Sequence, residues 1–332
     1  MTVSVSEVSL GRGVRGLVIE NDQIAVTVTP DKGADILSTR HKAANFDPMW
    51  VSQWGVRRPG VLATAQNSQL AWMEAYAGGW QELFPNGGAE LTLHGIELPF
   101  HGEASVSAWE WEVLPDGVRF FVRLVRSPFV LERFMWLVPG EATLKIEGRV
   151  ANTGRVPVEY MWSHHPAFGA PFLSGDCVIE TNAKRLIADP FAPGALLEPG
   201  VTYDWPIIPY QDGTLDLSII PGEDEPRGLM AYLAEFADEE AWYAIANRRT
   251  GHRLRFAWPR ADFPFAWLWQ EMHNSLGAPW YGESYVMAIE PATSWPGGLA
   301  NVMERTQTHR ILRPGETATN ELTLTLTAES VS

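Results

Sequence analysis

The sequence predicts an all-β protein, a large antiparallel β-sandwich with little helix. Short segments in which apolar and polar residues alternate recur through most of the chain, and turns rich in Gly, Pro and Asn separate them. No polar linker and no internal repeat divides the chain. With 332 residues, 45% of them hydrophobic, the chain can bury a sizeable core. We therefore expect residues 1–332 to form a single β-sandwich domain.

The predicted elements follow one another in chain order. Alternation at residues 24–29 resumes at 34–40 after a turn, and residues 229–236 fit a strand or a short helix. Residues 68–77 are predicted as a short helix, with Asn67 or Ser68 as N-cap. Other strands are expected at residues 118–126, 129–138, 143–150, 156–163, 178–186, 242–247, 252–258, 265–270, 284–290, 305–312 and 318–327.

Composition limits the partners that the protein can have. The formal net charge of −15 argues against nucleic acid or an anionic membrane, because both attract basic surfaces. Cys177 is the single cysteine, so no intramolecular disulfide can form. The N-terminus lacks signal-peptide features, and no stretch approaches 18 apolar residues. We expect a soluble, cytoplasmic protein. Its 15 tryptophans fill a β core or stack on sugars.

Two adjacent histidines follow the strand predicted at residues 156–163. Because neighbours in an extended chain point to opposite faces, only one of His164 and His165 can enter a given pocket. Pro166 favours an extended His165 and is expected to close the strand. These residues present one imidazole at a sheet edge, or they form a structural histidine pair.

Two further segments carry candidate chemistry. In the first, His101 and Glu103 share a face if the backbone is extended. In the second, Glu290 ends an apolar strand, where a carboxylate is costly to desolvate unless a group such as an imidazolium pairs with it. The alternative is that this strand reaches solvent at Pro291.

Taken together, these motifs resemble the aldose 1-epimerase (galactose mutarotase-like) family. His-Gly at 101–102, His-Pro-Ala-Phe at 165–168 and Ala-Ile-Glu-Pro at 288–291 occur in the family's order and approximate spacing. The resemblance covers residues 18–327. Gly-Gly-Trp-Gln, Phe-Pro-Asn and His-Gly-Glu are similar to a less characterised branch of unknown function. The resemblance implies a galactose mutarotase-like β-supersandwich and an isomerase of carbohydrate metabolism.

The resemblance also implies roles for three residues. Interconverting sugar anomers requires a base for the C1 hydroxyl proton and an acid for the ring oxygen. By motif, Glu290 is the base and His165 the acid, while His101 hydrogen-bonds the sugar near the ring oxygen. We expect the Glu290 carboxylate to raise the pKa of His165 and keep it protonated.

The sequence departs from the family in its sugar contacts. The family's arginine motif is absent from the region before His101, where Arg57 and Arg58 do not match it, and so is its aspartate motif, near Asp238 and Glu239. A galactose or glucose substrate therefore does not follow. The candidate substrate-binding residues are Trp80, as an aromatic platform, and Gln81, Asn86, Glu103 and Gln270.

Three other functions stay open. A noncatalytic carbohydrate-binding β-sandwich needs the tryptophans but no acid–base pair. An epimerase or isomerase of an unusual or acidic sugar could use Arg248 and Arg249 to neutralise a carboxylate or sulfonate. The possible ligands of a metal site are His94, His101, Glu103, His164, His165 and His273. We expect a small-molecule sugar as partner, with no cofactor, metal, nucleic acid or membrane; the oligomeric state is open.

Overall fold

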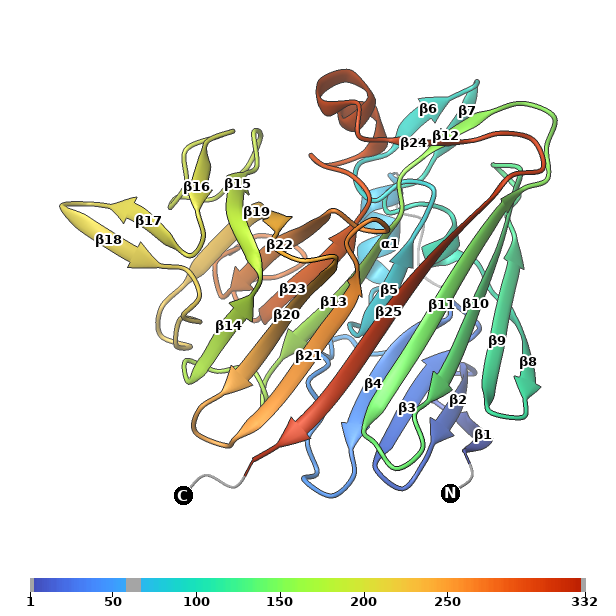
Figure 1. The fold of residues 1–332 in the computed structure, drawn as a ribbon, viewed down its shortest axis with the longest axis horizontal. Coiled ribbons are helices and arrows are strands. Elements are labelled where there is room, and N and C mark those ends of the chain that lie inside the picture. The colour runs from blue at the N-terminus through green and yellow to red at the C-terminus, as the bar shows by residue number, and fades with distance from the viewer. Residues whose placement is uncertain (1–2, 58–66, 330–332) are drawn as a thin grey trace.

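Two large antiparallel sheets dominate the computed structural model, which describes residues 3–57 and 67–329 (Figure 1). The 11-stranded sheet contains, in spatial order, β1 (Ser4–Ser9), β2 (Arg15–Glu20), β3 (Ile24–Thr29), β4 (Asp35–His41), β5 (Trp80–Leu83), β13 (Ser163–Gly169), β23 (Tyr285–Ala292), β22 (Phe265–Met272), β19 (Arg227–Phe236), β15 (Ala183–Ala188) and β16 (Thr202–Asp204). The 8-stranded sheet contains β14 (Cys177–Thr181), β20 (Glu240–Asn247), β21 (His252–Pro259), β25 (Thr317–Ala328), β11 (Thr143–Asn152), β10 (Phe129–Leu137), β9 (Gly117–Arg123) and β8 (Glu110–Leu114). The predicted all-β sandwich is confirmed.

Smaller elements lie around the two sheets. Three two-stranded sheets pair β6 (Leu91–Leu93) with β7 (Ile96–Leu98), β12 (Val158–Tyr160) with β24 (Arg310–Leu312), and β17 (Ile207–Tyr210) with β18 (Gly213–Asp216). The helical segments are α1 (Ser68–Glu74), α2 (Leu299–Asn301), the 3-10 turn η1 (Ala104–Val106) and the π-helical turn η2 (Val302–Thr306). The predicted N-cap is present, because the Asn67 side chain accepts a hydrogen bond from the Leu70 amide. No helix within 3–57 or 67–329 is long and apolar enough to cross a membrane.

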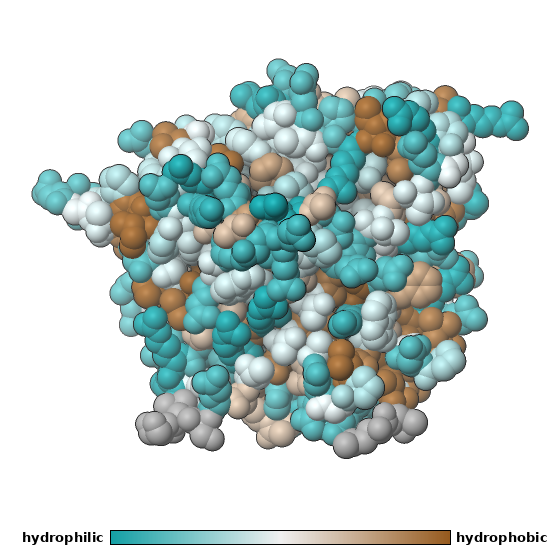
Figure 2. All heavy atoms as spheres, viewed as in Figure 1, coloured by the Kyte–Doolittle hydropathy of each residue, from teal (hydrophilic) through white to brown (hydrophobic). Residues whose placement is uncertain are grey.

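Alternation explains why the sheets pack face to face. Along β11, Leu144, Ile146 and Val150 are buried while Lys145 and Arg149 are exposed, so this strand has the predicted wet face. The inward side chains of both sheets form one hydrophobic cluster. The outer face of the 8-stranded sheet is mostly hydrophilic, with apolar side chains in patches (Figure 2).

Some strand boundaries differ from the sequence-based expectation, and residues 229–236, which fitted a strand or a short helix, are now assigned. The strand predicted at 156–163 is split into β12 and β13, and β13 continues through Pro166 to Gly169 instead of closing there. On the side of β23 the ladder of β13 omits residues 164–166, so the missing N–H of Pro166 breaks no pair there, while Pro166 remains the partner of Trp80 on β5. Residues 229–236 are a strand, within β19, and the strand expected at 305–312 is reduced to β24 after η2.

A buried ion pair joins the two sheets. Arg133 occupies an inward position of β10, and its Nη1 lies 3.3 Å from Oε2 of Glu82 on β5; both side chains are fully buried. Glu82 also accepts a hydrogen bond from Nε1 of Trp162 at 2.9 Å, and Arg133 donates to the carbonyl of Ala34. Burial raises the pKa of Glu82 and lowers that of Arg133, while each charge opposes the shift of the other.

The ion pair predicts an asymmetry between single and double substitutions. Glu82→Gln should lower the free energy of unfolding by about 3–5 kcal/mol, because it leaves the Arg133 charge buried without a counterion. Glu82→Leu combined with Arg133→Met should cost much less, since neither charge is then buried. Urea unfolding of the three proteins measures this, and a double variant less stable than the single one would contradict it.

Candidate active site

Strand β13 sends its two histidines to opposite faces of the 11-stranded sheet. His165 is paired with Gln81, and His164 is paired with Glu82 on the core side. His164 is completely buried, accepts a 3.1 Å hydrogen bond from Nε1 of Trp80, and packs against the edge of Phe263. The parity expected from the sequence is therefore present, and His165 alone faces the cavity on the other side of the sheet.

The cavity brings together the three residues that carry the sequence motifs. Nε2 of His165 lies 3.5 Å from Oε1 of Glu290, which projects from the neighbouring strand β23. The ring centroid of His101 lies 5.6 Å from that of His165. The cavity has a volume of about 290 Å³, at the small end of the range for ligand sites. It suits one small ligand.

His101 is fixed by its turn, where its φ of 59° is left-handed. Its Nδ1 lies 2.7 Å from the carbonyl oxygen of Gly87, and because a carbonyl only accepts, Nδ1 carries the proton. Burial keeps the pKa of His101 well below its usual value, with the nearby His165 adding to the effect. Nε2 of the neutral ring is therefore a hydrogen-bond acceptor.

Aromatic side chains form most of the cavity wall. Trp72 stacks on Tyr76 with 4.5 Å between centroids and meets the ring of His101 edge-on, also at 4.5 Å. Trp269 lies 6.0 Å from His165, and Trp267 on the same strand is paired with Glu290. We did not single out these residues from the sequence. Two sequence patterns could have identified them: the four-residue spacing of Trp72 and Tyr76, which places both on one helix face, and the two-residue spacing of Trp267 and Trp269, which places both on one strand face.

Burial shifts the pKa values of Glu290 and His165 toward their uncharged forms. Desolvation raises the pKa of Glu290 well above its usual value and lowers the pKa of His165 to about 4, with the Lys32 cation adding to the latter shift. The expectation that Glu290 keeps His165 protonated is therefore wrong, because the cost of burying the imidazolium outweighs its attraction to the carboxylate. Both shifts favour the uncharged forms, a carboxylic acid beside a neutral imidazole. Together they hold one transferable proton.

Three polar atoms on residues that line the cavity lack hydrogen-bond partners among the described residues and are shielded from solvent. Oε2 of Glu290, Nδ1 of His165 and the hydroxyl of Tyr76 are buried, and none has a hydrogen-bond partner in the part of the chain that the structure describes. Buried polar atoms without partners are costly, so a ligand that satisfies them gains affinity.

Two of the expected sugar contacts point into the core instead of the cavity. Trp80 is completely buried between the sheets, where its ring contacts His164 and Phe256. Gln270 lies on the core side of β22, with its Nε2 3.6 Å from Sδ of Met287. Strand parity is the reason in both cases: Trp80 is paired with Pro166, one residue beyond His165, and Gln270 follows Trp269.

Two more side chains expected to bind the sugar are instead hydrogen-bonded to backbone groups, and a third lies beside the site. Asn86 donates to the carbonyl of Ala89 at 2.7 Å and accepts from the Leu299 amide at 2.8 Å. Glu103 accepts from the Val125 and Arg126 amides, so it fixes a loop. Gln81 shares the sheet face of His165, but its amide donates to the carbonyl of Gly78 at 2.7 Å.

The candidate metal ligands do not gather. His94 pairs with Glu159 at 2.8 Å, and Nδ1 of His273 lies 2.7 Å from the carbonyl oxygen of Gly282. Within residues 3–57 and 67–329, no three His, Cys, Asp or Glu side chains are grouped so that they could hold a metal ion.

The arginines considered for an acidic sugar lie elsewhere. Arg248 and Arg249 are in the turn between β20 and β21, in the other sheet, and Arg249 pairs with Asp176 at 2.6 Å. Asp238 and Glu239 are in the turn between β19 and β20, where Asp238 contacts Asn182. Arg58 is outside the described residues.

Comparison with protein families now places this chain. A family described as "Domain of unknown function (DUF4432)" matches residues 11–193, more than half of the sequence. The chain belongs to the DUF4432 family. No functionally curated protein matches it.

Solved structures show which fold this DUF4432 protein shares. A candidate aldose 1-epimerase from Klebsiella pneumoniae is similar with a TM-score of 0.71 and 20% identity, over 98% of this chain and 83% of that one. A galactose mutarotase-like protein from Clostridium acetobutylicum has a TM-score of 0.68 at 14% identity, over 99% of each chain. A galactose mutarotase related enzyme from Lactobacillus acidophilus has a TM-score of 0.66 at 17% identity, over 94% and 97%. The galactose mutarotase-like fold expected from the motifs is confirmed.

The protonation state of the site can be measured directly. The imidazole of His165 should stay neutral down to about pH 5 and titrate near pH 4, because burial opposes its charge. NMR of ¹⁵N-labelled histidine, with His165→Gln to assign the signal, measures this pKa. A titration at or above the ordinary value of about 6.5 would contradict the neutral pair.

The same shift predicts a pH dependence of stability. The unfolded histidine takes up a proton near pH 6.5, whereas folded His165 does so only near 4, so its contribution to stability is lost as the pH falls between these values. Wild type should therefore lose up to about 1.4 kcal/mol per pH unit more than His165→Gln across this interval. Urea unfolding at pH 7 and pH 5 measures the difference; equal losses would contradict it.

Proposed function

We propose that this protein is an aldose 1-epimerase-like isomerase that interconverts the anomers of a sugar. The observation that carries the proposal is the 3.5 Å contact between His165 and Glu290 in a small, aromatic-lined cavity. Anomer exchange needs two proton-transfer groups within reach of one sugar ring, and titratable groups with shifted pKa values in a cavity are candidates for that role.

The proton balance of the reaction fits a pair that holds one proton. In the reactive form, the Glu290 carboxylate takes the proton of the C1 hydroxyl while the His165 imidazolium protonates the ring oxygen. The bond between C1 and the ring oxygen breaks, C1 becomes an aldehyde, and the pair is left as carboxylic acid and neutral imidazole. After the aldehyde turns, Glu290 returns its proton to the carbonyl oxygen, His165 takes back the proton of the hydroxyl that attacks C1, and the ring closes as the other anomer.

The neutral pair in the empty cavity has the protonation state that accompanies the open-chain sugar. Reaching the ion-pair form requires a proton transfer from Glu290 to His165 and no change in total charge. A bound ring promotes this transfer, since its C1 hydroxyl donates to the carboxylate and its ring oxygen accepts from the imidazolium. In this scheme Nε2 of His101 accepts a hydrogen bond from a sugar hydroxyl near the ring oxygen.

Removing the carboxylate should separate catalysis from binding. Glu290→Gln keeps the shape of the side chain but cannot accept a proton, so anomer exchange should fall about 10²–10⁴-fold while the sugar Kd changes little. NMR exchange spectroscopy over a panel of sugars measures the rate, and calorimetry measures the Kd. The matched control is Glu240→Gln, an exposed carboxylate paired with Arg255. If Glu290→Gln exchanges anomers as fast as wild type, the acid–base assignment is wrong; if wild type binds sugars but accelerates none, a noncatalytic binding protein is the better description.

The adjacent histidines offer a second matched comparison. His165→Asn should reduce anomer exchange about as much as Glu290→Gln, and the double variant should lose little more, because the two groups work in one proton circuit. His164→Asn removes the partner of Trp80 and should lower stability, while the folded fraction keeps its exchange rate. Rates per folded molecule, with unfolding curves, test this pair. A His164 variant as inactive as the His165 variant would contradict the parity argument.

A further inference from the structure

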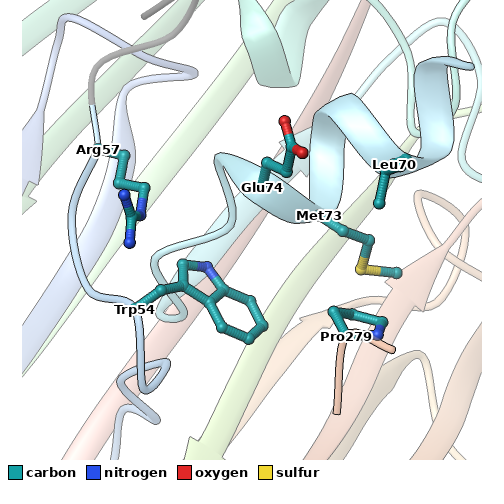
Figure 3. Close-up of a pocket in the computed structure, with 6 residues that line it drawn as sticks. All are labelled: Trp54, Arg57, Leu70, Met73, Glu74 and Pro279. Carbon is teal, nitrogen blue, oxygen red and sulfur yellow. The ribbon is translucent and has the colours of Figure 1, made fainter. Parts of the chain in front are cut away.

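A second cavity adjoins the proposed catalytic pocket, and helix α1 contributes residues to the lining of both. It has a volume of about 270 Å³, similar to the 290 Å³ of the catalytic pocket. Figure 3 shows its lining, formed by Trp54, Arg57, Leu70, Met73, Glu74 and Pro279. We call it the outer cavity. The two cavities are therefore large enough to hold chemical groups of similar size.

The two cavities share a wall. Met73 lines both of them, and Pro279 of the outer cavity is followed in the chain by Trp280, which lines the inner one. The flexible thioether of methionine is an adaptable boundary. A molecule that occupies both cavities must displace the Met73 side chain, which the flexible thioether permits.

A row of aromatic rings follows the same path. The centroid of Trp54 lies 6.0 Å from that of Trp280, which lies 5.7 Å from Trp269, which in turn lies 6.0 Å from His165. Neighbouring aromatic side chains therefore extend from the outer cavity to His165. Aromatic rings of this kind offer apolar faces on which the C–H faces of sugar rings can pack.

Trp54 is held in a fixed orientation. Nε1 of Trp54 donates a 2.7 Å hydrogen bond to the carbonyl of Tyr76. The backbone carbonyl of Trp54 accepts a 3.2 Å hydrogen bond from the guanidinium of Arg12. Because its polar atom is already satisfied, the exposed part of the indole is apolar. A preordered flat ring binds with little loss of conformational entropy.

The charges of the outer cavity argue for a neutral ligand. Arg57 and Glu74 both line it, and neither forms a hydrogen bond or ion pair with residues 3–57 or 67–329. The opposite charges of these two residues offset each other, so the lining contributed by residues 3–57 and 67–329 does not favour an anion. One supplies donors and the other acceptors, which suits the hydroxyl groups of a sugar.

We propose that the outer cavity is a subsite for the second ring of a neutral reducing disaccharide. The ring with the free C1 hydroxyl occupies the pocket of His165 and Glu290, and the other ring stacks on Trp54. The assignment rests on the proposed function, because anomer exchange requires a free C1 hydroxyl on the inner ring. It therefore names the substrate class: neutral sugars substituted at a position other than C1.

The test compares each disaccharide with its own reducing-end monosaccharide. We expect at least one neutral reducing disaccharide to have a KM about tenfold lower than its monosaccharide, and Trp54→Ala to remove most of that advantage. Trp54→Phe should restore part of it. The control is Trp242→Ala, a half-buried tryptophan on β20 in the other sheet, which should leave the ratio of the two KM values unchanged. Anomer exchange by NMR measures both constants.

The outcomes separate this inference from the proposed function. If monosaccharides are accelerated but no neutral disaccharide has the lower KM, or Trp54→Ala raises both KM values equally, the subsite is overturned and the isomerase proposal stands. A clear preference for disaccharides with a uronic acid as second ring would also overturn it. If no sugar is accelerated, calorimetry decides: tighter, Trp54-dependent binding of a disaccharide supports the subsite, and equal binding of both sugars overturns it.

Discussion

The alternation of side chains along β13 is the constraint on which the rest of this protein depends. It places His165 in a cavity and His164 between two sheets, although the residues are adjacent in sequence. The neighbouring strand β5 has the same division, with Gln81 on the cavity face and Glu82 on the core face. A shift of one residue in this register would exchange the groups on the two faces and would destroy both the core and the cavity together.

Both faces of the 11-stranded sheet bury a carboxyl group, and a different basic residue offsets the desolvation cost on each face. In the core, Glu82 is paired with Arg133, whose guanidinium does not release its proton, so the charges stay in place. In the cavity, Glu290 is beside His165, whose pKa can cross that of a buried carboxyl group. The first arrangement joins two sheets, whereas the second leaves one proton free to move. The choice of basic partner therefore distinguishes the structural ion pair from the pair to which we assign proton transfer.

The sequence predicted features that follow from periodicity and motif, and it failed where three-dimensional surroundings decide. Alternation and turn residues identified the β-sandwich, and parity separated His164 from His165. The same reasoning could have excluded Gln270 as a sugar contact, because it follows Trp269 on β22. It could also have excluded Trp80, had the pairing of β5 with β13 been known. Asn86 and Glu103 bind backbone groups from segments distant in sequence, which no local pattern reveals. The low pKa of His165 comes from burial, and burial is a property of the assembled fold.

The proposed chemistry and the shape of the cavity come from different kinds of segment. His165 and Glu290 stand on adjacent strands in the middle of the 11-stranded sheet, whereas Trp72 and Met73 come from α1 and Trp280 from a turn between β22 and β23. Loops and short helices accept insertions and substitutions that strands in a packed sheet do not. Substitutions in α1 and in this turn can therefore change the shape of the cavity while the proposed acid–base pair stays in place on the strands, so that in the proposed function the choice of substrate can change independently of the reaction.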